Sequence, residues 1–259
     1  MNSSVGSTRS GSDLAGYRAS PREQRRAADL LALMPPAGAS ALDVGARDGH
    51  LSRLMAERYA RVVALDLTQP SIEHPRIECR QGDATKLPFD DASFDCVLCA
   101  EVLEHIPPAS LALACRELTR VARHVVVIGV PYKQDLRSGR TRCGRCGGVN
   151  PPWGHVNAFD EQRLGELFEP LAAARISYVG STRQFTNPVS AALMNFSGNP
   201  FGTYEQDEPC VHCNEALAAP VARNRAQKIA TRLAFILDSI QRRFSAAHAN
   251  WIHVRFEKQ

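Results

Sequence analysis

The chain has 259 residues, of which 44% are apolar and 22% are charged, and its formal net charge is +4. This composition excludes the disordered and fibrous classes, and the length predicts one α/β domain with insertions rather than two full-sized domains. The mild basic excess is well below the dense clustering that indicates nucleic-acid binding by itself. No apolar stretch approaches the ~20 residues that cross a bilayer. Since the Ser-rich beginning also lacks the apolar centre of a signal peptide, we expect a cytoplasmic protein with no membrane span.

The beginning of the chain predicts a flexible tail followed by a helix. Residues 1–19 are rich in Ser and Gly and show almost no apolar periodicity, which is typical of a flexible tail. The segment Ser20–Glu23 has Ser at a possible N-cap, Pro at the first helical position and Glu three residues after the Ser. We therefore expect a helix from here to about Met34, and a folded domain that spans residues 20–259.

Short apolar runs alternate with helical patterns from residue 40 to Pro131. The candidate strands are SALDVG, RVVALDL, PRIECRQGD, SFDCVLCAEVL and HVVVIGVP, and the candidate helices are HLSRLMAERY and SLALACRELTRVA. Alternation of this kind predicts a parallel sheet with helices on both faces.

The order of elements changes beyond Pro131. A helical pattern runs from Asp160 to Phe168, an apolar run over 172–180 indicates a sixth strand, and a long irregular stretch covers 181–220. The final segment, NWIHVRFEK, alternates and predicts a closing strand. Before it, apolar residues recur at spacings of three and four, as one apolar face of a helix does: Ile229, Leu233, Ile236, Leu237, Ile240 and Phe244.

Carboxylates follow a glycine-containing turn at the spacing of a nucleotide site. The segment LDVGARDGHLS places a strand, a turn and a helix start in succession, which brings backbone N–H groups and a helix N-terminus toward a ligand. Asp66 ends the next strand about 20 residues downstream, where a carboxylate accepts hydrogen bonds from ribose hydroxyls. Asp83 stands at another strand end beside the apolar LPF, which suits an adenine ring. For the glycines alone, an ordinary tight turn is the alternative.

Class I methyltransferases that use S-adenosylmethionine (SAM) have successive motifs that this chain resembles over roughly residues 40–180. The motifs here are DVGARDGHLS, VVALD, GDATKLPFDDASFDCVLCAEVLEHI and a later GHVNAF. The resemblance implies a SAM-dependent methyltransferase with a Rossmann-like, seven-stranded α/β sheet. It also implies that the last strand, which NWIHVRFEK fits, is antiparallel.

The resemblance also implies which residues contact SAM. Asp43, Gly45 and Gly49 should shape the methionine side of the site. Asp66 should hold the ribose, and Asp83 with the residue after it should hold the adenine. The full set of implied cofactor contacts is Asp43, Gly45, Ala46, Arg47, Gly49, Asp66, Leu67, Asp83, Ala84 and Cys99.

The glycine loop departs from the family at Arg47, where a third glycine is usual. Two outcomes stay open: Arg47 forms a salt bridge with the SAM carboxylate, or it crowds the loop and weakens binding. A nicotinamide dehydrogenase is the rival class for such a fold. Its G-x-G-x-x-G motif, however, requires glycines where Arg47 and His50 stand.

Two Cys-x-x-Cys pairs lie in the insertions, at about 133–157 and 181–220. Cys143 and Cys146 precede two glycines that let backbone N–H groups turn toward the sulfurs, and Cys210 and Cys213 form the second pair. Since a reducing compartment disfavours disulfides, the four thiolates predict a structural, tetrahedral zinc site. The alternatives are unrelated surface cysteines or a redox pair. The other cysteines fall on strand or helix patterns and are expected in the core: Cys79, Cys96, Cys99 and Cys115.

Four further residues are candidates for catalysis. Glu101, Glu104 and His105 follow the fourth strand, and His155 lies in GHVNAF. They resemble the metal-binding residues of two O-methyltransferase groups, those of ubiquinone biosynthesis and those that methylate small-RNA 3′ ends. The resemblance implies a second divalent cation that orients an acceptor hydroxyl. The alternative is that His105 or His155 is a general base, or only contacts substrate.

The sequence indicates only broad classes of methyl acceptor. The fourth strand lacks the Asn/Asp-Pro-Pro-Tyr/Phe tetrad of enzymes that methylate exocyclic base amines. We therefore expect transfer to an oxygen or nitrogen of a small molecule, such as a sugar, a glycolipid precursor or a secondary metabolite. The alternative is an RNA methyltransferase that uses the zinc knuckle and the basic helix near the C-terminus to hold phosphates. The sequence predicts no oligomeric state.

Overall fold

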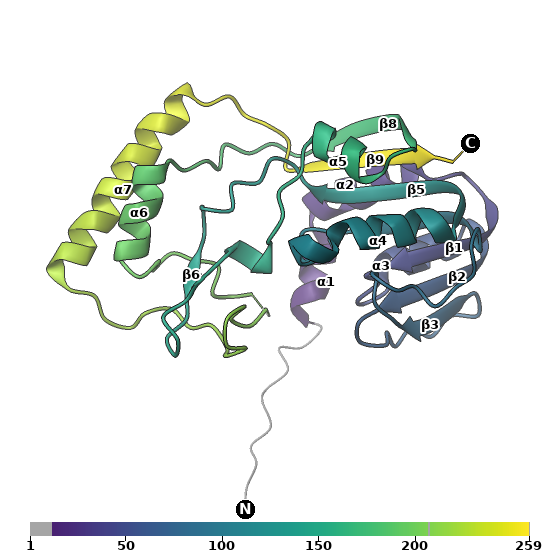
Figure 1. The fold of residues 1–259 in the computed structure, drawn as a ribbon, viewed down its shortest axis with the longest axis horizontal. Helices are drawn as coiled ribbons and strands as arrows, with labels where there is room; N and C mark the ends of the chain where they lie inside the picture. Colours follow the sequence, from purple (N-terminus) through teal and green to yellow (C-terminus); the bar gives the residue numbers. More distant parts are fainter. Residues whose placement is uncertain (1–11, 207, 259) are drawn as a thin grey trace, which may run out of the picture.

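A seven-stranded sheet dominates the computed structural model, which describes residues 12–206 and 208–258 (Figure 1). In spatial order the strands are β3, β2, β1, β4, β5, β9 and β8. Strands β1 to β5 run parallel, and β9 is antiparallel to both β5 and β8. This order confirms the Rossmann-like fold and the antiparallel last strand. The strands span Gly38–Val44 (β1), Tyr59–Asp66 (β2), Ile77–Gln81 (β3), Phe94–Ala100 (β4), Ala122–Pro131 (β5), Ala172–Val179 (β8) and Trp251–Glu257 (β9).

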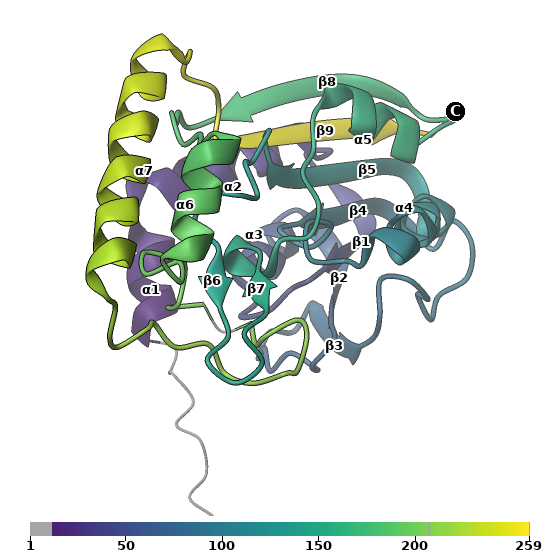
Figure 2. The same cartoon turned by 60° about the vertical axis from the view of Figure 1, so that its left-hand side comes forward.

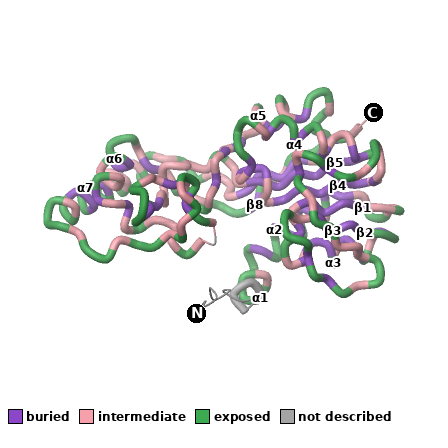
Figure 3. Tube along the Cα trace, turned by 60° about the horizontal axis from the view of Figure 1, so that its bottom comes forward, coloured by how far each residue is buried: buried purple, intermediate pink, exposed green. Residues whose placement is uncertain are grey.

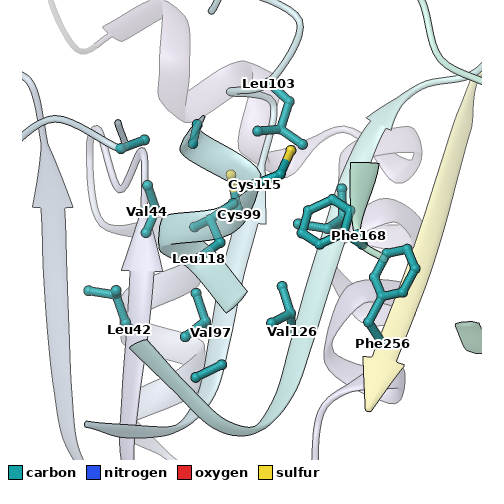
Figure 4. Packing of buried hydrophobic residues seen from close by; sticks show 14 of the residues in the cluster. Leu42, Val44, Val97, Cys99, Leu103, Cys115, Leu118, Val126, Phe168 and Phe256 are labelled. Atoms are coloured by element: carbon teal, nitrogen blue, oxygen red, sulfur yellow. The ribbon is translucent and has the colours of Figure 1, made fainter. Parts of the chain in front are cut away.

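Helices cover both faces of the sheet because alternate residues of each strand point to opposite sides. In β1, Ala41 packs in a core with α2 and α3, while Leu42 packs in a core with α4 and α5. Figure 4 shows the second of these cores, in which the rings of Phe168 and Phe256 stack with their centroids 4.6 Å apart. These helices span Pro21–Leu33 (α2), His50–Ala56 (α3), Pro108–Val121 (α4) and Glu161–Leu167 (α5).

The start of α2 forms as the sequence predicts. The Ser20 hydroxyl accepts a hydrogen bond from the backbone N–H of Glu23 at 3.3 Å, and Pro21 occupies the first helical position. The helix ends at Leu33, because the two prolines that follow cannot continue it.

Part of the predicted flexible tail is helical instead. Helix α1 covers Ser12–Ala19, and the remaining residues of that prediction, 1–11, lie outside the described residues. Arg18 at the end of α1 donates hydrogen bonds to Glu23 on α2, at 2.6 Å, and to Asp48, at 2.9 and 3.2 Å. These ion pairs supply tertiary contacts that the weak apolar periodicity of the segment does not indicate.

The insertions form a lobe beside the sheet (Figure 2). A short antiparallel hairpin of β6 (Thr141–Arg142) and β7 (Val149–Asn150) lies between β5 and α5 in sequence. The stretch 181–220, predicted to be irregular, contains the helix α6 (Pro188–Phe196). Helix α7 (Arg225–Phe244) lies beside α6 in both views, at the edge of the molecule.

Helix α7 forms as its periodicity predicts, and the apolar face that the spacing indicates is largely exposed. The residues that it buries are Ala230, Thr231 and Ala234, whereas Ile229 and Ile236 are more than half exposed. Figure 3 shows the exposed outer side of this lobe. Within the described part of the chain, no helix is both long enough and apolar enough to cross a membrane.

Candidate active site

The predicted cofactor residues gather where parallel strands end. Val44 ends β1, Asp66 ends β2 and Gln81 ends β3, and the register aligns Val44 with Leu65 and Asp66 with Gln81. The segments that follow these strands therefore meet at one edge of the sheet. In open α/β sheets this carboxyl edge is where ligands bind.

Two glycines shape the loop between β1 and α3. Gly45 has a φ of 82° and Gly49 a φ of 74°, a region that side-chain-bearing residues disfavour. A Cβ atom at Gly45 would overlap Val102, and one at Gly49 would overlap Ile72. Both positions therefore require glycine for backbone shape and for space, and Gly49 is also the N-cap residue of α3.

Arg47 fits into this loop although the family usually has glycine there. Its φ is 47°, a left-handed conformation that costs a non-glycine residue roughly 1–2 kcal/mol. Its backbone N–H donates a hydrogen bond to Oδ2 of Asp66 at 2.9 Å, which offsets part of that cost. The loop backbone therefore accommodates Arg47, and Asp66 accepts the N–H of this residue. Pairing of its guanidinium with the SAM carboxylate stays a prediction.

The residues predicted to hold ribose and adenine line this edge. Asp66 is half-buried, and the next side chain, Leu67, is 69% exposed, which leaves it open to cover a flat ring. Oδ1 of Asp83 accepts hydrogen bonds from the backbone N–H and the hydroxyl of Thr85, both at 2.8 Å. This turn fixes the Asp83 carboxylate, and Ala84 beside it is buried.

Three other predicted cofactor residues have buried side chains. Asp43 accepts a hydrogen bond from the Ser52 hydroxyl at 2.5 Å, and burial raises the pKa of Asp43 to about 6. Asp43 and Ala46 therefore support the loop from beneath. Cys99 is aligned with Val44 near the end of β4, and its side chain is fully buried in the core with Cys115. A contact between Cys99 and the cofactor would therefore be made by its backbone, and it stays a prediction.

Three of the four predicted catalytic residues converge. One ligand atom from each of Glu104, His105 and His155 lies within 4.8 Å of the others. The rings of the two histidines are nearly perpendicular, at 88°, with centroids 4.6 Å apart. Nδ1 of His155 donates to Oε1 of Gln134 at 2.6 Å, a partner that sequence reasoning missed, and Nε2 keeps its lone pair. Burial, and then the neighbouring His105, lowers the pKa of His155 to about 3, so this imidazole is neutral.

Backbone contacts explain why His155 reaches this position from a separate loop. The backbone N–H groups of Val156 and Asn157 both donate to the carbonyl oxygen of Glu104, at 2.8 and 3.2 Å. The Asn157 amide donates to the carbonyl oxygens of Leu103 and Ile106, at 2.9 and 2.6 Å. The GHVNAF segment is therefore fastened to the turn after β4, and the Asn in that motif is the signal for this contact.

Glu104 is the least satisfied polar group of the cluster. Its side chain is fully buried, and neither carboxylate oxygen has a hydrogen-bond partner among the described residues. Burial, and then the neighbouring Glu101, raises the pKa of Glu104 well above its usual range. An unpaired buried carboxylate is costly, so this position suits a proton or a cation.

Glu101 faces the N-terminal helices rather than the histidines. Its Oε1 lies 3.8 Å from Nη1 of Arg26, and Arg26 makes a two-point pair with Glu23, with both distances 2.8 Å. Arg18 and Asp48 extend this chain of charges to the loop before α3. Sequence reasoning missed this network. Its signal was a pair of charged residues, Glu23 and Arg26, on the buried face of α2.

The four cysteines of the two Cys-x-x-Cys pairs come together. Their sulfurs all lie within 4.8 Å of one another, and Cys143–Cys213 and Cys146–Cys210 are each 3.6 Å apart. The backbone N–H groups of Gly148 and His212 donate to the sulfurs of Cys146 and Cys210, at 3.4 and 3.5 Å. The four cysteines therefore join two insertions that are far apart in sequence.

Comparisons with known proteins agree with this geometry. A family described as "Methyltransferase domain" matches residues 42–127. The ubiquinone biosynthesis O-methyltransferase of Leptothrix cholodnii is 33% identical over 95 residues, which cover 32% of this chain and 40% of that protein. A protein of Mycolicibacterium smegmatis named as a probable SAM-dependent methyltransferase is 30% identical over 139 residues, 51% of each chain. Residues 42–127 match a methyltransferase domain, and the sheet that contains them has the fold of class I SAM-dependent methyltransferases.

The solved structures extend the likeness of this methyltransferase fold to nearly the whole chain. The N-methyltransferase NodS of Bradyrhizobium japonicum, in complex with S-adenosyl-L-homocysteine, has a TM-score of 0.55 and 15% identity, and the match covers 96% of this chain and 93% of that one. At this identity the likeness shows the fold alone. The matched segments span only about two fifths to one half of the two curated relatives, so the activity and substrate of the whole protein are matters for proposal.

Proposed function

We propose that this chain transfers a methyl group from SAM to an oxygen or nitrogen of a small molecule. Methyl transfer from a sulfonium is an in-line displacement, so the protein mainly has to align the two reactants and remove a proton where needed. The single observation that carries the proposal is that Glu104, His105 and His155 converge at the sheet edge that holds Asp66 and Asp83. The cofactor and a proton-accepting cluster thus share one edge.

SAM would be held by the residues placed along that edge. Asp66 would accept hydrogen bonds from the ribose hydroxyls, and the exposed Leu67 beside it would cover one face of the adenine. Asp83 would accept from the adenine amino group. The Gly45–Gly49 loop lets backbone N–H groups approach the methionine part closely, and Arg47 would pair with its carboxylate.

We further propose that Glu104, His105 and His155 bind a divalent cation. The donor set fits, because both oxygens of Glu104 are buried without a partner and His155 is held by Gln134 with Nε2 available. A cation bound there would lower the pKa of an acceptor hydroxyl. Glu104, His105 and His155 would also orient the acceptor and exclude water. The alternative, a general base with no metal, would be His155.

The acceptor would enter a hollow that the second Cys pair helps to form. This hollow measures about 420 Å³ and is lined by His105, Gly154 and residues 208–214. Such a volume suits a small molecule. The names of the relatives, among them ubiquinone biosynthesis O-methyltransferases, also favour a small acceptor over RNA.

The four cysteines would hold a structural zinc that shapes the hollow. Four thiolates complete a tetrahedral site and leave no open position for chemistry, and N–H groups directed at the sulfurs are the usual outer contacts of such a site. Since residues 210–213 line the hollow with His105, the zinc would act on catalysis by holding the wall in place.

Manganese binding tests the second metal site without an identified acceptor. Mn²⁺ titration followed by electron paramagnetic resonance should show one exchangeable site, and Glu104→Gln should weaken binding at least ~10-fold because the amide removes the anionic ligand. Glu57→Gln is the matched control, since Glu57 is exposed just before β2, at the opposite edge of the sheet. Absence of an exchangeable site in folded protein that keeps its cysteine-bound zinc would overturn the metal proposal.

Turnover distinguishes metal from simple base catalysis. With labelled SAM and pools of small-molecule acceptors, a chelator that leaves the cysteine-bound zinc in place should abolish transfer, and Mg²⁺ or Mn²⁺ should restore it. If the stripped enzyme turns over at full rate, no divalent cation is needed and His155 becomes the proposed base.

A further inference from the structure

Helix α7 carries a stripe of apolar side chains that are about half exposed or more. The exposed fractions are 57% for Ile229, 47% for Leu233, 55% for Ile236, 52% for Ile240 and 85% for Phe244. Spacings of four, three, four and four residues place these side chains on one face of a helix. Contiguous exposed apolar patches of this kind mark interaction sites. We therefore expect another surface to bind this stripe.

Basic residues flank the apolar stripe. Arg225 is four residues before Ile229, and Arg232 is four residues before Ile236, so each arginine lies beside the stripe on the helix surface. Arg243 follows Ile240 by three residues, and all three arginines are exposed. None of the ion pairs among the described residues uses them. The outer face of α7 therefore combines apolar and cationic groups.

The only acidic residue within Arg225–Phe244 points away from this face. Asp238 is half-buried, and its Oδ1 accepts hydrogen bonds from the Thr186 hydroxyl at 2.9 Å and the Asn187 amide at 3.4 Å. The opposite face of α7, with Ala230 and Ala234, is buried on the side of α6. Packing within the lobe thus uses the small and acidic residues and leaves the basic, apolar face outward.

The position of α7 gives this face free access to a flat surface. The helix has 20 residues, which corresponds to about 30 Å, and it forms the edge of the lobe, with α6 between it and the sheet in Figure 1. No described helix can cross a membrane. A long, exposed amphipathic helix flanked by arginines is the form that lies in a membrane interface.

We propose that the outer face of α7 binds the surface of an anionic lipid bilayer. The apolar stripe from Ile229 to Phe244 would enter the boundary between headgroups and acyl chains, and the flanking arginines would contact anionic headgroups. A second copy of this chain fits less well, because pairing two α7 helices would bring their arginines together without a carboxylate between them. The inference uses no residue of the cofactor site and does not rest on the proposed methyl transfer.

Vesicle co-sedimentation tests this surface directly. The full chain should bind vesicles of phosphatidylcholine with 30–40% phosphatidylglycerol and should bind pure phosphatidylcholine vesicles much more weakly, with affinity falling as salt rises, as expected for screened charges. Ile236→Ser combined with Ile240→Ser should lower the partition coefficient by about 10-fold, because two apolar side chains no longer enter the interface. Arg225→Gln and Arg243→Gln should each lower it about 5-fold.

Leu113→Ser is the matched control, because Leu113 on α4 is also an exposed apolar side chain, at 43%, outside this stripe. It should leave vesicle binding unchanged, and circular dichroism should show all variants folded. Equal binding to neutral and anionic vesicles, or unchanged binding by the Ile236/Ile240 variant, would overturn the proposal. So would a concentration-dependent dimer, lost in that variant, in a protein that binds no vesicles, because it would assign the stripe to a second copy.

Discussion

Two carboxylates near the same sheet edge have opposite surroundings. Asp66 is half-buried and accepts a backbone N–H from Arg47, so its charge is partly stabilised and it remains open to a ligand. Glu104 is fully buried without a hydrogen-bond donor, so its charge needs a cation or a proton. Their chemistry is therefore distinct: Asp66 suits neutral hydroxyl donors, and Glu104 suits a positive group.

Replacement of Asp66 should weaken SAM binding without unfolding the protein. Asp66→Ala removes the ribose acceptor and frees the N–H of Arg47, and we expect a loss of roughly 1–3 kcal/mol, the usual cost of an unpaired partner. Calorimetric titration of the variant with SAM measures this. Asp90→Ala, in an exposed position that is not part of the predicted site, is the control and should bind like the wild type. Equal affinities for wild type and Asp66→Ala would contradict the assigned role.

Helices and strands can be predicted from local sequence where their apolar periodicity matches the face that they bury. The strands and helices between residue 40 and Pro131 are predictable because their apolar periods match the faces that they bury. Helix α6 was missed although Asn187 and Pro188 are N-cap and first-turn signals, and α1 was missed because ion pairs hold it. For α7, periodicity identifies the apolar face but not what covers it.

The candidate site was predictable to different depths. The residues of the glycine loop and the strand ends lie within the sequence motifs themselves. Their positions in the fold therefore follow from the order of the parallel strands. The ion pairs from Arg18 to Glu101 were not predictable, since they join segments whose packing angle no local pattern specifies. The motif also does not specify the direction of the Cys99 side chain, which points into the core because side chains alternate across a strand.

The two insertions should depend on one shared zinc. Elemental analysis of freshly purified protein should give one zinc per chain, and Cys143→Ser combined with Cys210→Ser should lose it, because the remaining thiols cannot complete the site. Cys79→Ser, in β3 and distant in sequence from both pairs, should keep the metal. Less than about half an equivalent in the wild type, or full zinc in the double variant, would show that the cysteines bind no shared ion.

On the scale of the whole molecule, the chain divides its tasks between sheet and lobe. The parallel strand ends present the predicted cofactor residues, Gly154 and the segment with the second Cys pair line the proposed acceptor hollow, and α7 forms the outer edge of the lobe. The lobe is fastened to the sheet beside the candidate catalytic cluster, where the backbone N–H groups of Val156 and Asn157 donate hydrogen bonds to the carbonyl oxygen of Glu104. Changes in the lobe should therefore affect acceptor use more than SAM affinity.

Binding of SAM to the intact chain tests the central claim most directly. Isothermal titration calorimetry of folded protein should show one site per chain for both SAM and S-adenosyl-L-homocysteine, with affinity in the micromolar range, because Asp66 and Asp83 stand at the strand ends where we predict that ribose and adenine bind. No heat of binding for either ligand, from protein that circular dichroism shows to be folded, would contradict the assignment of this edge as a SAM site.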